Sequence, residues 1–397
     1  MKTQDYILLE DRYGAHNYHP LDVVIASAQG VWMTDVEGRR YLDCLSAYSA
    51  LNQGHCHPTI LQAFIEQARK VTITSRAFRN DQFPLLLEKL HQITGYDMIL
   101  PMNSGAEAVE TALKAARKWG YTIKGIPRDK AEILCARNNF HGRTTTIVGF
   151  STEEQYKYGF GPFPAGFKIV DFGSIEDLRS AITPSTAAFL VEPIQGEAGV
   201  VIPPDGYLHE AAALCRQNNV LFIADEIQSG LGRSGKLFAF EHENIRPDVV
   251  IIGKALGGGF YPISAVLSNK EVLGVFQPGD HGSTFGGNPL ASAVAIASLD
   301  VIVEEKLIER SAELGKYFLE KIRSIRSPYF VEVRGRGLWI AVVLNQKARP
   351  FCEALMNKGI LCKETHENIV RLAPPLIITK EEIDWACERL KTVFNKQ

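Results

Sequence analysis

Short runs of apolar residues alternate with amphipathic stretches through the middle of the chain. The apolar runs lie at 133–136, 188–192, 220–225 and 249–253. They are apolar up to their last residue, a pattern typical of strands buried on both faces of a parallel sheet. The stretches 174–182 and 205–217 between them predict helices. Strand, helix and strand in succession predict a doubly wound α/β domain with right-handed crossovers.

The two ends of the chain show different patterns. The N-terminal part mixes Gly, Pro and short alternating strands such as 30–35. Residues 288–325 predict a long helical region with a break near Glu305, followed by a strand at 338–344 and two further helices. We therefore predict a large central α/β domain and a smaller α+β domain built from both termini. The limits are 1–45 for the N-terminal part of the small domain, 46–287 for the large domain, and 288–397 for an interdomain helix and the C-terminal part of the small domain.

Composition and charge narrow the classes of protein further. The 397 residues carry a formal net charge of −2, and 46% are hydrophobic, as in ordinary globular domains. The near-zero net charge gives no indication of a basic surface for nucleic acid or anionic lipid. No apolar run is long enough to span a membrane. The seven cysteines form no Cys-x-x-Cys pair, and the N-terminus has no signal- or transit-peptide pattern. We expect a cytoplasmic protein whose partners are small molecules or other subunits.

Two successive strands end in residues that carry chemistry. The run 220–225 ends in Asp225, and Lys254 follows the run 249–253. In open α/β sheets, ligands bind outside the carboxyl ends of the strands, so both side chains would enter one crevice. A desolvated lysine loses its proton and acts as a nucleophile, and a buried aspartate suits a protonated pyridine nitrogen. Taken alone, the two residues also fit a simple ion pair between strand ends.

A phosphate-binding helix start is the third element. Ser104 and Glu107 have the spacing of a capping box, and they precede a helix predicted to run to 119 and to stop at Gly120. Gly105 would allow close approach of an anion to the free N–H groups and positive dipole end of this helix. An ordinary capped helix has the same pattern.

Six motifs appear in one order along the chain. They are NSGAEA at 103–108, NFHGRT at 139–144, EPIQGE at 192–197, DEIQSGLGR at 225–233, GKALGG at 253–258 and HGSTFGGN at 281–288. On these motifs the chain resembles the class III pyridoxal phosphate aminotransferases, which have the fold type I architecture, over essentially its whole length. The segments GAHNYHP at 14–20 and SAYSALNQGHCHP at 46–58 resemble the members that act on ornithine.

The resemblance implies a pyridoxal 5'-phosphate site. Lys254 would hold the cofactor covalently, Asp225 would keep its ring nitrogen protonated, and Gln228 would bind its ring hydroxyl. Phe140 and Ile227 would cover the two faces of the ring. The phosphate would be bound by Ser104, Gly105 and Ala106 and by Ser283 and Thr284 of a neighbouring subunit, which implies at least a homodimer.

The resemblance also implies the substrates and their contacts. The side-chain amine of L-ornithine would be transferred to 2-oxoglutarate, giving glutamate 5-semialdehyde and glutamate. Arg143 would bind the α-carboxylate, Tyr18 would hold the α-amine, and Tyr48 would line the same pocket. Glu197 and Arg371 would form a gate that opens for 2-oxoglutarate. Without the resemblance, packing is the favoured interpretation of the two tyrosines, and structural ion pairs are the favoured interpretation of the two arginines. An N-acetylornithine or other ω-amine aminotransferase is the alternative.

Two local features suggest other kinds of site, and one residue differs from the family pattern. His55 and His57 alternate without a second ligand pair, so we expect no zinc site. Gly257, Gly258 and Gly259 follow Lys254 and do not form a P-loop. His141 stands where animal members that act on ornithine have Trp, which bears on the shape of the pocket.

Overall fold

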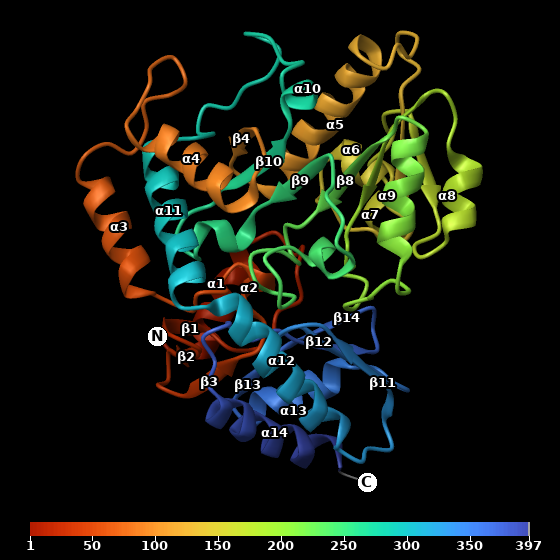
Figure 1. The fold of residues 1–397 in the computed structure, drawn as a ribbon. Coiled ribbons are helices and arrows are strands. Elements are labelled where there is room, and N and C mark those ends of the chain that lie inside the picture. Colours follow the sequence, from red (N-terminus) through yellow and green to blue (C-terminus); the bar gives the residue numbers. More distant parts are fainter. Residues whose placement is uncertain (396–397) are drawn as a thin grey trace.

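A computed structural model describes residues 1–395, and a seven-stranded sheet forms its centre (Figure 1). Its strands are β4 (Met98–Met102), β10 (Ser264–Ser268), β9 (Val249–Ile252), β8 (Leu221–Asp225), β7 (Thr186–Val191), β5 (Glu132–Ala136) and β6 (Phe167–Val170), in that spatial order. β10 is antiparallel to both of its neighbours, and the pairs from β9 to β6 are all parallel. The predicted α/β class with a large, mainly parallel sheet is confirmed.

Both faces of this sheet are buried, which explains the uninterrupted apolar runs. Phe222 and Ala224 of β8 belong to a hydrophobic cluster that includes α9 (Tyr207–Gln217). Leu221 and Ile223 of the same strand belong to a second cluster that includes α5. Alternate residues of one strand point to opposite faces, so a strand covered on both sides must be apolar at every position.

Helix α5 (Gly105–Thr122) begins as predicted but ends later. Ser104 accepts a hydrogen bond from the Glu107 N–H, and the Glu107 side chain accepts one from the Ser104 N–H, so the capping box is confirmed. The predicted stop at Gly120 is wrong, because this glycine is buried inside the helix. A Cβ there would lie 3.1 Å from the Cβ of Ala187, so Gly120 serves close packing of the helix on the sheet.

The long helical region after the central sheet is divided where the pattern predicted. α11 (Pro289–Glu304) ends just before Glu305, and Lys306 has a φ of 53° before α12 (Leu307–Arg323) begins. α11 packs against α3 (Pro58–Ala68) and α4 (Gln82–Thr94) beside the central sheet.

Two smaller sheets lie below the central sheet in Figure 1. One joins both ends of the chain: β1 (Ile25–Gln29), β2 (Trp32–Asp35), β3 (Arg40–Asp43) and β13 (Ile360–Leu361). The other contains β11 (Phe330–Gly335), β12 (Ile340–Leu344), β15 (Ile369–Leu372) and β14 (Lys363–Thr365), and α13 (Arg349–Asn357) and α14 (Lys380–Phe394) accompany these sheets. The domain limits at 45/46 and 287/288 remain a prediction.

The remaining helices are short, apart from α1. They are α1 (Thr3–Tyr13), α2 (Ser46–Ser49), α6 (Thr145–Gly149), α7 (Glu154–Lys157), α8 (Ile175–Ala181), α10 (Lys270–Leu273) and the 3₁₀ helices η1 (Ala239–Glu243) and η2 (Lys254–Gly257). Among residues 1–395, no helix combines the length and apolar character needed to cross a membrane.

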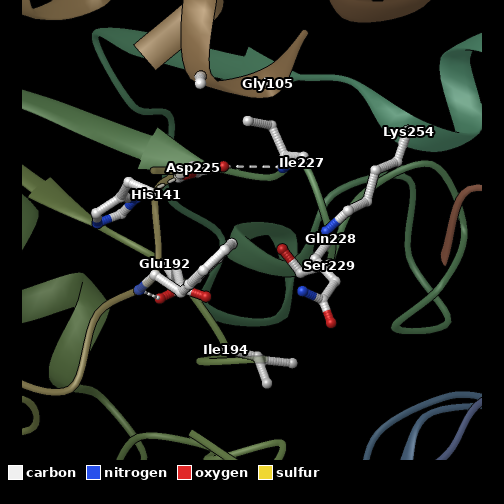
Figure 2. Close-up of a pocket in the computed structure, with 12 residues that line it drawn as sticks. Gly105, His141, Glu192, Ile194, Asp225, Ile227, Gln228, Ser229 and Lys254 are labelled. Carbon is white, nitrogen blue, oxygen red and sulfur yellow. Dashed lines mark hydrogen bonds and ion pairs between the residues drawn. The ribbon is translucent and has the colours of Figure 1, made fainter. Parts of the chain in front are cut away.

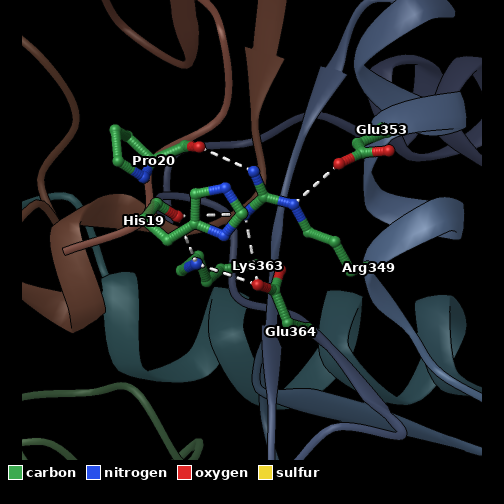
Figure 3. Close-up of polar contacts among 6 residues, drawn as sticks. All are labelled: His19, Pro20, Arg349, Glu353, Lys363 and Glu364. Carbon is green, nitrogen blue, oxygen red and sulfur yellow. Dashed lines mark hydrogen bonds and ion pairs between the residues drawn. The ribbon is translucent and has the colours of Figure 1, made fainter.

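One arginine fastens the N-terminal segment to the C-terminal part of the chain (Figure 3). The Arg349 guanidinium donates to the carbonyl oxygens of His19 at 3.1 Å and Pro20 at 2.6 Å. Glu353 and Glu364 accept from the same guanidinium, at 2.8 and 3.2 Å, and hold it in place. The segment that carries Tyr18 is therefore positioned by residues that follow it by more than three hundred positions.

Candidate active site

A cavity of about 200 Å³ opens where β7, β8 and β9 end and α5 begins. Its lining combines residues from strand ends with residues from the helix start: Gly105, Ala106, Phe140, His141, Gly142, Glu192, Ile194, Asp225, Ile227, Gln228, Ser229 and Lys254. The crevice predicted at the carboxyl ends of the parallel strands therefore exists, and it receives both Asp225 and Lys254.

Lys254 is the first residue of η2, directly after β9 and Gly253. Figure 2 shows its side chain extending toward Gln228. Burial lowers the pKa of the Lys254 amine, although the nearby carboxylate of Glu197 acts in the opposite direction. A lower pKa increases the fraction of neutral amine, the form that acts as nucleophile and base.

Asp225 ends β8 with its carboxylate buried, and each of its oxygens accepts one hydrogen bond. One oxygen accepts from the Ile227 N–H at 3.0 Å, and the other accepts from Nδ1 of His141 at 2.6 Å. His141 is itself buried, and its Nε2 has no hydrogen-bond partner in the described structure. The sequence analysis placed Asp225 but missed His141 as its partner; the motif at 139–144 was the available signal.

Glu192 is a second carboxylate that the sequence analysis missed. It follows β7, and it accepts hydrogen bonds from the backbone N–H groups of Phe140 at 2.9 Å and Gly196 at 3.1 Å. Burial raises the pKa of Glu192 to about 7, while His141 acts to lower it. Glu192 is the last residue of an apolar run, so the strand-end reasoning applied to Asp225 would have found it too.

The start of α5 provides an anion site beside these groups. Gly105 and Ala106 line the cavity, whereas Ser104 is exposed and caps the helix. A Cβ on Gly105 would lie 3.0 Å from Cδ1 of Ile227, so a larger residue would crowd the cavity wall. Backbone N–H groups at such a helix start favour a phosphate.

An ion pair lies beside the cavity and contacts Gln228, one of the residues that line it. Nη1 of Arg371 lies 3.1 Å from Oε1 of Glu197, and it also donates to Oε1 of Gln228 at 3.1 Å. Burial alone raises the pKa of Glu197, but the charges of Arg371 and Lys254 outweigh this and hold it below its usual value. The guanidinium of Arg371 also lies 4.9 Å from the centre of the Tyr48 ring.

Arg143 and Tyr18 line a neighbouring hollow of about 320 Å³. The Arg143 guanidinium stacks 3.7 Å from the ring centre of Tyr156 and has no carboxylate within 4 Å among the described residues. An arginine that stacks on an aromatic ring remains free to form a bidentate pair with a carboxylate.

Ser283 and Thr284 do not line the cavity of this chain. Oγ of Ser283 accepts from the side-chain amide of Asn103 at 2.9 Å, and Thr284 is exposed. Their predicted contact with the phosphate of a second subunit stays a prediction.

The two histidines considered for zinc have other partners. His55 lies 2.9 Å from Asp43, and His57 lies 2.9 Å from Glu305. Across the described part of the chain, no three His, Cys, Asp or Glu side chains are grouped to hold a metal ion.

Comparison with known proteins defines the class. The family model "Aminotransferase class-III" matches residues 13–394. The chain belongs to the class-III aminotransferases, and it is a pyridoxal phosphate-dependent transferase.

Individual relatives are similar over the whole chain. It is 63% identical to a protein named ornithine aminotransferase from Geobacillus sp. (strain WCH70), over 99% of both chains. A solved ornithine aminotransferase from Toxoplasma gondii with pyridoxal phosphate in partial occupancy at its active site is 44% identical (TM-score 0.98, 99% of this chain and 94% of that one). An acetylornithine aminotransferase from Elizabethkingia anophelis is 46% identical (TM-score 0.91, 99% of both chains).

The cavity fits pyridoxal phosphate on three observations. The N-terminus of α5 faces it, and Gly105 and Ala106 at that end of the helix line it. The buried carboxylate of Asp225 is oriented by two hydrogen bonds, and the amine of Lys254 has a lowered pKa. These are the anion site, the partner for a pyridine nitrogen and the nucleophile that this cofactor requires.

Proposed function

We propose that this chain is an ornithine δ-aminotransferase, which transfers the side-chain amine of L-ornithine to 2-oxoglutarate. The products would be glutamate 5-semialdehyde, which closes to pyrroline-5-carboxylate, and glutamate. The observation that carries the proposal is the Glu197–Arg371 pair at 3.1 Å beside the Lys254 cavity. Such a pair hides the arginine while an amino acid enters with its side-chain amine first. The full-length similarity to relatives named ornithine aminotransferase supports the same substrate.

The residues that would hold the cofactor surround the cavity from several elements. Bound there, pyridoxal phosphate supplies the electron sink that stabilises negative charge on the substrate carbon. Phe140 and Ile227 would cover the ring faces, and Gln228 would bind the ring hydroxyl. Ser104, Gly105 and Ala106 would bind the phosphate.

Lys254 and Asp225 would handle the protons. Lys254, whose pKa burial lowers, would accept a proton from the substrate carbon and return it. Asp225 would hold a proton at the pyridine nitrogen, and the hydrogen bond from His141 fixes the direction of its carboxylate.

The substrate groups would be bound on the other side of the cavity. Arg143, which no described carboxylate neutralises, would bind the α-carboxylate of ornithine, and Tyr18 and Tyr48 would surround the α-amine. Arg371 would bind a carboxylate of 2-oxoglutarate after separating from Glu197.

The assembly would be at least a homodimer in the cytoplasm. Ser283 and Thr284 would reach the phosphate bound in the second subunit. Support comes from the resemblance and from the exposure of Thr284.

A spectral titration tests the proposal. Adding ornithine to the holoenzyme should bleach the absorbance of the bound cofactor, and 2-oxoglutarate should restore it, because the two half-reactions alternate on one site. Comparing the turnover of ornithine, N-acetylornithine and 4-aminobutyrate decides between the proposal and the acetylornithine alternative. The similarity to the acetylornithine aminotransferase from Elizabethkingia anophelis is the reason to test this alternative. A preference for N-acetylornithine would overturn the proposed substrate.

A further inference from the structure

Four consecutive residues of α2 have a left-handed backbone. The φ angles of Ser46, Ala47, Tyr48 and Ser49 are 49°, 44°, 61° and 72°. None of the four is glycine or asparagine, the residues that adopt this conformation readily. Left-handed residues of this kind persist only where the surrounding structure determines them, and they gather at functional sites.

The buried carboxylate of Asp43 holds the turn at its start. Its Oδ1 accepts from the backbone N–H groups of Leu45 and Ser46, both at 2.8 Å. Its Oδ2 accepts from Nε2 of His55 at 2.9 Å, so both oxygens are engaged. The Asp43 side chain is 0% exposed, so bulk solvent does not reach these hydrogen bonds.

The turn connects the two halves of the proposed active site. The hydroxyl of Ser46 donates to the carbonyl oxygen of Ala373 at 2.7 Å, two residues beyond Arg371. The turn also packs against η2, which begins with Lys254. Its Tyr48 ring lies 4.9 Å from the Arg371 guanidinium.

We propose that Asp43, oriented by His55, is a positioning residue for substrate selection: it locks the left-handed turn that places Tyr48 against the Glu197–Arg371 pair. The inference rests on the proposed function, in which Tyr48 lines the pocket for the α-amine of ornithine. In the right-handed conformation, Tyr48 would leave this position, and ornithine would lose a contact that glutamate does not use.

Ala47 allows the turn to be tested without disturbing the core, because its side chain is exposed. Ala47→Val disfavours the left-handed conformation, since a β-branched residue is rarely found there, whereas Ala47→Gly favours it. We expect Ala47→Val to lower kcat/KM for ornithine by roughly tenfold or more, within the ~10²-fold that a 1 Å misplacement costs. In the same variant, kcat/KM for the glutamate half-reaction should change less. Ala47→Gly should have the wild-type ratio of kcat/KM for ornithine to kcat/KM for glutamate, and it should unfold at a higher temperature than wild type.

A double-mutant cycle tests Asp43 itself. Asp43→Ala should lower the ornithine-to-glutamate ratio of kcat/KM, and Asp43→Asn, which keeps an acceptor for both N–H groups, should restore most of it. In a Tyr48→Ala background, Asp43→Ala should cause little further change in that ratio, because residues that act through one another are not additive.

The possible results distinguish failure of this inference from failure of the proposed function. An unchanged ratio in Ala47→Val, or additive effects of Asp43→Ala and Tyr48→Ala, would overturn this inference while leaving the proposed function intact. Absence of ornithine turnover in the wild-type holoenzyme would overturn the proposed function, and this inference with it.

Discussion

The floor and the rim of the cavity are built in different ways. The floor consists of Glu192, Asp225 and Lys254, each next to the end of a strand in the central sheet. What we call the rim is the group Tyr48, Glu197 and Arg371, which adjoins the cavity at Gln228. Its members come from three distant segments and meet only in the folded chain. We infer that the floor carries the chemistry common to both half-reactions, and that the rim selects the substrate. Substitutions in the two regions should therefore have different kinetic signatures.

The largest effect is expected at the floor, for Lys254→Ala. Loss of the general acid/base group alone costs about 10²–10⁴-fold in rate, and loss of the covalent link adds to this. The rates of both half-reactions should fall by similar factors in single-turnover measurements. Equilibrium dialysis should still detect bound cofactor. The exposed Lys316→Ala serves as the matched control. Near-normal turnover of the variant would falsify the role given to Lys254.

Asp225→Ala should have the next largest effect. Removing a preorganised electrostatic group typically costs about 10²–10³-fold in kcat, and we expect a loss of that size with little change in KM for ornithine. Asp225→Asn separates the charge from the hydrogen bonds to Ile227 and His141. A rise in KM alone, at constant kcat, would show that Asp225 belongs with the binding residues of the rim.

At the rim, Glu197→Ala should change selectivity more than rate. Removing one partner of a close, desolvated charge pair costs on the order of 2–5 kcal/mol, and here it leaves Arg371 as a permanent carboxylate site. Glutamate should become a better donor relative to ornithine, measured as the ratio of kcat/KM in the two half-reactions. Exposed Glu210→Ala is the control. A constant ratio would mean that the pair does not act as a gate.

The smallest effect concerns Glu192 and the pH dependence of stability. Its folded pKa of about 7 lies above the usual 4.5, so the folded state retains a proton that the unfolded state loses as the pH rises. Wild type should therefore lose stability between about pH 4.5 and pH 7, by at most about 3 kcal/mol. Glu192→Gln should lack this slope in melting temperatures taken from pH 5 to 8, apart from a constant offset for its altered hydrogen bonds. Parallel curves for the two proteins would contradict the raised pKa.

Sequence pattern alone determined much of the framework and two residues of the floor, Asp225 and Lys254, but not Glu192. Strands buried on both faces are apolar throughout, so the apolar runs located β5, β7, β8 and β9, and with them the positions of Asp225 and Lys254. The capping box of Ser104 and Glu107 is likewise a local signal, because its two hydrogen bonds join residues three positions apart. The prediction at Gly120 was wrong because a glycine can either end a helix or allow it to pack closely on a sheet. Only the close approach to Ala187 in the folded chain shows that Gly120 does the second.

Tertiary structure decided the partners and the conformations. His141 and Asp225 are 84 positions apart, and Glu197 and Arg371 are 174 apart, so no local pattern records that they meet. The left-handed turn at 46–49 opposes the intrinsic preference of its own residues, and its Ser46 hydroxyl donates to Ala373, 327 positions away. Sequence encodes local preferences and burial periodicity directly, whereas contacts between distant segments, and the strain that they impose, arise only when the chain is packed.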